Sequence, residues 1–205
     1  MVLALEALER LKSGNKRFTS GAIRQHKLIS PNQLKNLPLE QAPFAIILGC
    51  SDARVPAELI FDQGVGDLFV IRVAGNIVAP SQVGSVEFAA ERFGVKLVVV
   101  LGHTHCGAIS ATIEAFQQPA SEQSPNIHSI IKRINRSVID VLKTEHDTPK
   151  ILMQKAVHAN INASVNHLRH GSEVLEQLTK KNNLLIMGAE YSLDTMVVHF
   201  FNEVP

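Results

Sequence analysis

Two stretches of the sequence contain side chains that bind borderline-soft metal ions. Cys50 stands in Gly-Cys-Ser-Asp-Ala-Arg, and His103 and Cys106 stand further along in His-Thr-His-Cys. Thiolate and imidazole are ligands that zinc favours, and three protein ligands on a tetrahedral ion leave one position for water. The pKa of water on zinc falls to about 7, which makes hydroxide available as a nucleophile at neutral pH. These residue types therefore predict a catalytic zinc site.

Asp52 and Arg54 form a second chemical feature, directly beside Cys50. Residues two apart in an extended segment point the same way, so Arg54 can hold Asp52 in a bidentate ion pair. A free carboxylate near zinc would compete for the fourth position, whereas one held by arginine can accept a hydrogen bond from water at the metal. We expect Asp52 to orient that water and to take part in proton transfer.

Simpler interpretations of the same residues exist. A buried cysteine at a strand end is often only a small apolar side chain, and a single His-x-x-Cys is equally weak evidence. A disulfide between Cys50 and Cys106, the only two cysteines of the chain, is the main rival. A reduced compartment disfavours that bridge, and the absence of Cys-x-x-Cys makes a redox role weaker still. The combination with the adjacent Asp/Arg pair favours a metal.

Composition excludes several classes of partner. The chain has 205 residues, of which 45% are apolar and 19% charged, which suits one globular domain over 1–205. Lys and Arg (20) nearly balance Asp and Glu (19), so we expect neither nucleic acid nor a membrane surface as a partner. The N-terminus does not resemble a signal peptide and no long apolar run exists, so we expect a cytoplasmic protein.

Continuous apolar runs separated by helical patterns predict an α/β fold. Such runs are typical of strands buried on both faces of a parallel sheet. Four runs are expected to form the central sheet, and a fifth is expected to add a terminal edge strand: 44–50, 67–75, 96–102, 183–191 and 195–201. We expect one doubly wound, mostly parallel sheet with helices on both faces.

Helical patterns occupy the segments between these runs. Helices are predicted over 3–12, 56–62, 81–94 and 106–117, with two or three more within 127–180. Gly14 is expected to end the first helix, and Ser81 to open the third. Residues 24–42 are polar and contain prolines, so 1–42 is predicted to form a helical and extended arm that packs on a partner subunit.

The expected strands explain how distant residues could meet. Cys50 follows the first strand run, and His103 and Cys106 lie just past the third. In open α/β sheets, ligands bind outside the carboxyl ends of the strands, where the strand order reverses. If the first and third strands are neighbours, the two clusters meet at one place.

The two motifs together resemble the β-class carbonic anhydrases, whose marks are Cys-x-Asp-x-Arg and His-x-x-Cys. The likeness extends to ALERLKSGNKRF, GCSDARVPAELIF, GDLFVIRVAGN, VVVLGHTHCGAI and MGAEYSLDT, and it covers essentially the whole chain. It implies one zinc ion per subunit on Cys50, His103 and Cys106, with Asp52 and Arg54 as the catalytic pair. The implied reaction is the reversible hydration of carbon dioxide to bicarbonate.

The resemblance also implies a substrate pocket built across a homodimer or a dimer of dimers. Gln41 would donate a hydrogen bond to bicarbonate, and Phe69, Ala74 and Phe88 would line the apolar wall. The family often has Val and Tyr where this chain has Ala74 and Phe88, which changes the pocket volume and one hydroxyl contact. Without the resemblance, both phenylalanines would be interpreted as core. His105 is expected to point away from the metal, as a supporting or proton-exporting group.

Some relatives close the site at lower pH, when the Asp takes the fourth zinc position. Bicarbonate assists them from a pocket that includes a Trp three positions before the first Cys. Ile47 stands there, and the chain has no Trp. We therefore expect Asp52 to stay paired with Arg54 near neutral pH. Hydrolysis of carbonyl sulfide or carbon disulfide at the same zinc, or a non-catalytic zinc protein, are the alternative functions.

Overall fold

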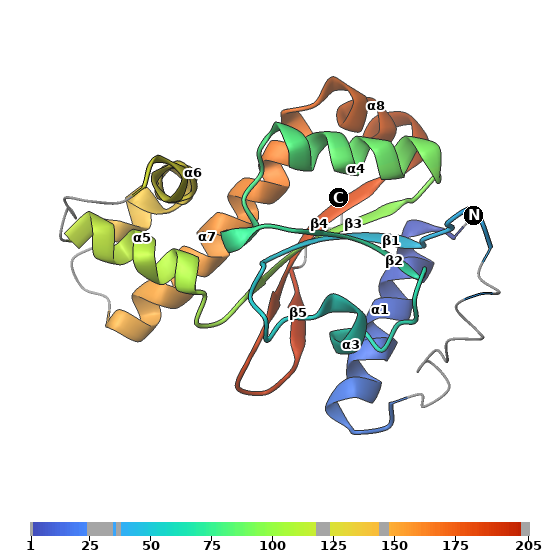
Figure 1. Cartoon of the computed structure of the whole chain (residues 1–205), viewed down its shortest axis with the longest axis horizontal. Coiled ribbons are helices and arrows are strands. Elements are labelled where there is room, and N and C mark those ends of the chain that lie inside the picture. The colour runs from blue at the N-terminus through green and yellow to red at the C-terminus, as the bar shows by residue number, and fades with distance from the viewer. Residues whose placement is uncertain (1, 24–34, 36–37, 118–123, 144–147, 202–205) are drawn as a thin grey trace.

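One five-stranded sheet forms the centre of the protein (Figure 1). The computed structural model describes residues 2–23, 35, 38–117, 124–143 and 148–201. The strand order is β2-β1-β3-β4-β5, and every pairing is parallel except the last, in which β5 runs antiparallel to β4. The strands are β1 (Ala45–Gly49), β2 (Leu68–Arg72), β3 (Leu97–His103), β4 (Leu185–Tyr191) and β5 (Val198–Phe200). The predicted mostly parallel α/β sheet with a terminal edge strand is confirmed.

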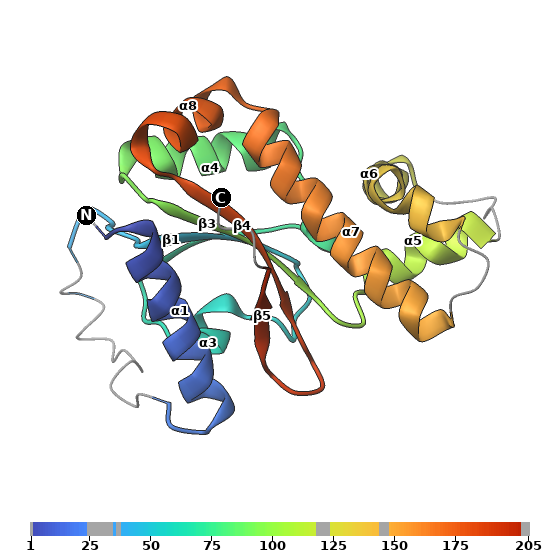
Figure 2. The same ribbon diagram turned by 180° about the vertical axis from the view of Figure 1, so that it is seen from behind.

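Helices cover both faces of this sheet, as Figures 1 and 2 show from opposite sides. One face is covered by α1 (Ala4–Thr19) and α3 (Ala57–Ile60). The other face is covered by α4 (Pro80–Arg92), α7 (Pro149–His170) and α8 (Glu173–Asn182), and α5 (Gly107–Gln117) and α6 (Pro125–Leu142) lie beside α7. The two or three helices predicted within 127–180 correspond to α6, α7 and α8.

The apolar run of β1 serves two hydrophobic clusters at once. Successive side chains of a strand point to opposite faces. Ile46 and Leu48 pack in the cluster under α4 and α7, and Ala45 and Ile47 pack in the cluster under α1 and α3. All five residues of β1 and all seven of β3 are buried. Such a strand is continuously apolar in sequence because both of its faces are dry.

The second apolar run behaves differently from the prediction. β2 lies at an edge of the sheet and is only partly buried, because it has β1 on one side and no strand on the other in the described chain. It ends at Arg72, and a 3₁₀ turn, η2 (Ala74–Asn76), follows it. Gly75 has φ of 68° there, a backbone conformation that favours glycine.

Two predicted helix boundaries are wrong. α1 continues through Gly14 to Thr19, because Gly14 is a point of close contact: a Cβ there would overlap the Phe61 carbonyl oxygen. α4 begins at Pro80 and not at Ser81, and the preceding Ala79 makes no side-chain cap. Proline suits the first helical position, because its φ is already helical and its missing N–H would have no partner within the helix.

The close contact at Gly14 leads to a prediction about stability. Gly14→Ala is expected to lower the free energy of unfolding by about 1–3 kcal/mol, because the added methyl overpacks the contact between α1 and α3. Gly84→Ala is the matched control, since a Cβ added at this position of α4 would have nothing within 4 Å of it. The control is expected to gain about 0.5–1 kcal/mol of helix stability. Urea unfolding at fixed subunit concentration measures both, and equal effects would contradict the close contact at Gly14.

The N-terminal arm begins with a helix that packs on the sheet of its own chain. Leu8 and Leu11 of α1 lie in the cluster that contains Ile47. Most of the segment predicted to be extended, 24–34 and 36–37, lies outside the described residues. Packing of the arm on a partner therefore stays a prediction. Among the described helices, none is both long and apolar enough to cross a membrane.

Candidate metal centre

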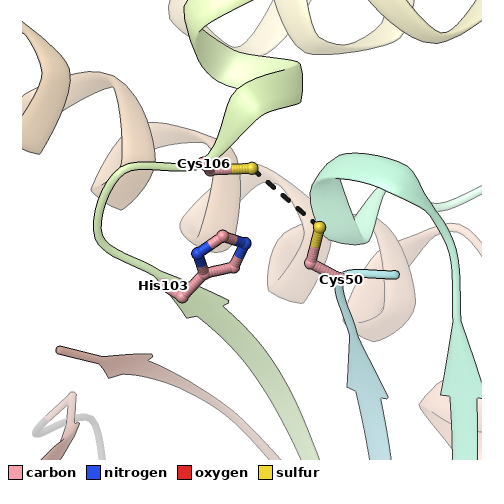
Figure 3. A group of neighbouring side chains, drawn as sticks. All are labelled: Cys50, His103 and Cys106. Carbon is pink, nitrogen blue, oxygen red and sulfur yellow. Dashed lines mark hydrogen bonds between the residues drawn. The ribbon is translucent and has the colours of Figure 1, made fainter. Parts of the chain in front are cut away.

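The two chemical motifs meet at the carboxyl ends of β1 and β3. These strands pair in parallel, and the chain order reverses between them, with β2 on one side of β1 and β3 on the other. Cys50 directly follows β1, His103 is the last residue of β3, and Cys106 precedes α5. Figure 3 shows the three side chains turned toward one another. The predicted adjacency of the first and third strands, on which the site depends, is confirmed.

The spacing of the three side chains suits a shared metal ion. Their ligand atoms all lie within 4.8 Å of one another, and the Cys50 and Cys106 sulfurs are 4.0 Å apart. Two sulfurs bound about 2.3 Å from a tetrahedral zinc would be ~3.8 Å apart. A disulfide needs about 2.05 Å, and both cysteines are free. The geometry matches a pair of ligands and not a bridge.

The imidazole of His103 is oriented so that one nitrogen has no protein partner. Its Nδ1 lies 2.9 Å from the Thr104 carbonyl oxygen, which assigns the proton to Nδ1. Its Nε2 is fully buried and has no hydrogen-bond partner among the described residues. Buried polar atoms are rarely left in this state, because desolvation without a bond is costly. A lone pair aimed at the two sulfurs is what a metal ion would satisfy.

The two cysteine thiols differ in acidity. The hydrogen bond from Cys106 lowers the pKa of the Cys50 thiol, and its burial only partly opposes this. The same interaction, together with burial, raises the pKa of Cys106. The Gly75 amide also donates to the Cys50 sulfur at 3.3 Å. The cluster therefore favours a thiolate at Cys50, and the resulting negative charge attracts a cation.

Asp52 and Arg54 form the expected bidentate pair. Arg54 donates from Nε to Oδ1 of Asp52 at 2.9 Å and from Nη2 to Oδ2 at 2.7 Å, and its backbone amide also donates to Oδ1. These bonds hold the pKa of the Asp52 carboxyl well below its usual value. Oδ2 lies 3.8 Å from Nε2 of His103. The carboxylate is thus beside the cluster with both oxygens occupied by arginine.

Sequence reasoning missed one residue that shapes this loop. Arg72 donates from Nε to the Cys50 carbonyl oxygen at 3.0 Å and from Nη2 to the Asp52 carbonyl oxygen at 2.6 Å. It can do so because β1 and β2 pair with Gly49 opposite Arg72. Only that register, which the sequence does not reveal, would have identified the residue.

The position of Arg72 predicts a loss of function without loss of a ligand. Arg72→Gln is expected to weaken metal affinity or activity by about 10–100-fold, because supporting partners of a metal site have effects of this size. Arg92→Gln, an exposed arginine at the end of α4, is the control and is expected to change neither. Titration of the metal against a chelator measures the metal affinity of both variants, and stopped-flow assays measure their activity. An unaltered Arg72→Gln protein would contradict the supporting role.

Three of the remaining predicted residues lie away from the site of their own chain. Gln41 is exposed and precedes β1, whereas Cys50 follows β1 at its other end. Phe69 pairs with Ile46, which is four residues before Cys50 and therefore ~13 Å from it along the strand. Phe88 lies on α4 and is 53% exposed. The structure does not bring these three residues to the Cys/His cluster of the same subunit.

The aromatic residues nevertheless form a group of their own. The ring centroids of Phe69 and Phe88 are 6.5 Å apart, and both rings also lie close to Phe93. Ala74 differs from them, because it begins η2 and directly precedes Gly75, which donates to Cys50. His105 points to the surface as predicted: its Nε2 lies 3.4 Å from Asp194, and its side chain is 61% exposed.

Comparison with known proteins identifies the family. The sequence profile described as "Carbonic anhydrase" matches residues 45–198. The β-carbonic anhydrase CcaA superposes with a TM-score of 0.73 at 26% identity, covering 97% of this chain and 92% of CcaA. The chain belongs to the β-class carbonic anhydrases. Membership of this family makes it a lyase, and the resemblance inferred from the two motifs is confirmed.

Relatives of the family match nearly the full length of the chain. Carbonic anhydrase 2 of Mycobacterium tuberculosis is 35% identical over 188 residues, which cover 92% of this chain and 88% of the relative. The carbonic anhydrase of Mycolicibacterium smegmatis is 34% identical over 187 residues, with 91% and 88% covered. A structure described as tetrameric β-carbonic anhydrases of Sordaria macrospora shares the fold, with a TM-score of 0.72 at 20% identity, covering 93% and 94%.

Proposed function

We propose that this β-class carbonic anhydrase catalyses the reversible hydration of carbon dioxide to bicarbonate and a proton, with zinc as its metal. The observation that most supports the proposal is the buried, unpartnered Nε2 of His103, which faces two free cysteine sulfurs. One imidazole and two thiols form a donor set that suits zinc. The names of the relatives agree with this reaction.

Zinc would be held by Cys50, His103 and Cys106, one ion per subunit. Bound there, it would supply a Lewis acid that lowers the pKa of water at its fourth position to about 7. The chain contributes the buried surroundings of this position and the carboxylate beside it. The cytoplasm, where thiols stay reduced, suits a site that needs both thiolates.

Asp52 is the proposed orienting group for the reacting water. Its carboxylate stays ionised near neutral pH, since Arg54 lowers its pKa, and an ionised carboxylate can only accept hydrogen bonds. By accepting a hydrogen bond from the water it would aim the oxygen lone pair at carbon dioxide. Both carboxylate oxygens already accept bonds from Arg54, which supports the open form, in which Asp52 is not itself a ligand.

The complete site is proposed to need a second subunit. Gln41, Phe69 and Phe88 lie away from their own metal centre, so the roles proposed for them would have to be at the centre of a partner. Phe88 is a large apolar side chain exposed next to Phe69 on an edge of the fold, as expected for a surface that another subunit covers. This arrangement supports the proposal of a homodimer or a dimer of dimers.

The experiment that tests the function combines metal analysis with assays across pH. We expect about one zinc per subunit and a hydration rate that rises as pH passes through about 7, where water on the metal loses its proton. The low pKa of Asp52 predicts how activity depends on acid. The carboxylate is charged above its folded pKa, so its protonation lowers activity only in strong acid and causes no loss near neutral pH.

The same samples separate the alternatives. Zinc-loaded protein that hydrates no carbon dioxide at any pH would instead support a non-catalytic zinc protein. Release of hydrogen sulfide from carbonyl sulfide or carbon disulfide, faster than hydration of carbon dioxide, would favour the hydrolase. The Asp52–Arg54 pair argues against a purely structural metal, because such a site has no use for a carboxylate restrained beside its ligands.

A further inference from the structure

A cavity of about 230 Å³ lies between α6, α7 and the segment that follows η2. None of the three cluster residues Cys50, His103 and Cys106 lines it. Figures 1 and 2 both show α6 lying beside α7, and η2 contacts both helices and β1. We propose that this cavity is a second binding site, which takes a small organic anion with two carboxylate groups.

The charge of the cavity wall points to an anion. Arg133 and Arg136 from α6 and His167 from α7 line it, and its lining residues include no Asp or Glu. Within the described part of the chain, neither arginine forms an ion pair, and Arg133 makes only a long bond of 3.5 Å to the Val78 carbonyl oxygen. Guanidinium groups match carboxylates bidentately, so two of them can hold two carboxylates.

The floor of the cavity is polar, and hydrogen bonds within the chain fix its side chains. Asn160 and Ser164 on α7 are 2% and 5% exposed. The Asn160 side chain donates to the Gly75 carbonyl oxygen at 2.8 Å, and the Ser164 hydroxyl donates to the Asn76 carbonyl oxygen at 3.0 Å. These bonds join α7 to η2 and leave the floor little freedom to collapse. A preformed site loses less entropy when it binds a ligand.

The rest of the wall favours an organic ligand over a simple inorganic ion. Ile77, Val78 and Ala163 contribute apolar surface next to the basic groups. A bare oxyanion would leave this surface without a partner, whereas the short carbon chain of a dicarboxylate would cover it. The cavity wall therefore combines two guanidinium groups, one imidazole and an apolar flank. This combination favours a dicarboxylate of about four carbons, which is short enough for a cavity of this small volume.

The binding test uses zinc-loaded protein, succinate as the probe and inorganic phosphate as the comparison, by isothermal titration calorimetry at constant ionic strength. We expect succinate to bind with a dissociation constant of about 1 mM or lower, and more tightly than phosphate. Arg133→Gln/Arg136→Gln is expected to weaken succinate binding at least tenfold. Lys132→Gln/Lys143→Gln removes the same charge from exposed positions of the same helix segment and is expected to bind like the parent.

A second variant separates an effect on the cavity from a general effect on folding. Ala163→Leu fills the cavity without changing charge and is also expected to weaken succinate binding at least tenfold, with zinc content and carbon dioxide hydration kept at the parent level. The proposal would be overturned if succinate failed to bind the parent or bound it no more tightly than phosphate. It would also be overturned if both double variants weakened succinate binding equally. Retained binding in Ala163→Leu would overturn it as well.

Discussion

Replacing Cys50 with alanine is expected to remove both metal and activity. The variant loses one of three ligands and leaves His103 and Cys106 as a two-ligand site, which cannot compete for zinc. Zinc content should fall from about one per subunit to near zero. Carbon dioxide hydration should fall at least ~10³-fold, since a catalytic metal contributes several kcal/mol to the transition state. Elemental analysis and stopped-flow assays on the same preparation measure both quantities.

Ser51→Ala is the matched control for this loss. Ser51 is the exposed neighbour of Cys50, and no hydrogen bond of its side chain supports the cluster in the described structure. The control is expected to keep parent zinc content and parent turnover. A metal-depleted Cys50→Ala protein that hydrates carbon dioxide at the parent rate would refute the proposed metal centre.

Asp52→Asn is expected to separate catalysis from metal binding. The amide keeps the shape of the carboxylate but cannot accept bonds at both positions, so it orients the reacting water poorly and takes up no proton. Zinc content should stay at about one per subunit, because Asp52 is not among the three clustered ligands. The turnover number should fall by about 10²–10⁴, the range for loss of a positioned acid–base group. KM should change much less than kcat.

Asp194→Asn provides the corresponding control. Asp194 is an exposed carboxylate that lies 3.4 Å from Nε2 of His105, so the variant removes one negative charge without touching the Asp52–Arg54 pair. It should keep the parent turnover number. If Asp52→Asn lost its zinc, or retained full activity, the role assigned to Asp52 would be wrong.

The metal centre was predictable from sequence because its residues follow a general rule of α/β sheets. Cys50 and His103 lie at the carboxyl ends of two apolar runs, and parallel strands bring such ends to one edge of the sheet. The bidentate pair was predictable because Asp52 and Arg54 are only two residues apart. The extended segment assumed for it was wrong, since the two residues lie in a turn that the Val55 amide closes on the Asp52 carbonyl oxygen. Neither inference needed contacts between distant side chains beyond the order of the strands.

Other features depend on contacts that the sequence does not encode locally. Gly14 is typical of a helix end, yet it lies inside α1 because the Phe61 backbone approaches it. Arg72 is typical of the polar end of a strand, and its role depends on the β1–β2 register. Phe69 and Phe88 can be assigned to a substrate pocket only with a second subunit present, so a single chain leaves their predicted roles untested.

A crystal structure of the purified protein near neutral pH, with anomalous data at the zinc edge, tests the central claim most directly. We predict one anomalous peak bonded to the Cys50 and Cys106 sulfurs and to Nε2 of His103, with a water molecule as fourth ligand and Asp52 still held by Arg54. A zinc peak elsewhere in the molecule, or an Asp52 oxygen in the fourth position, would contradict it.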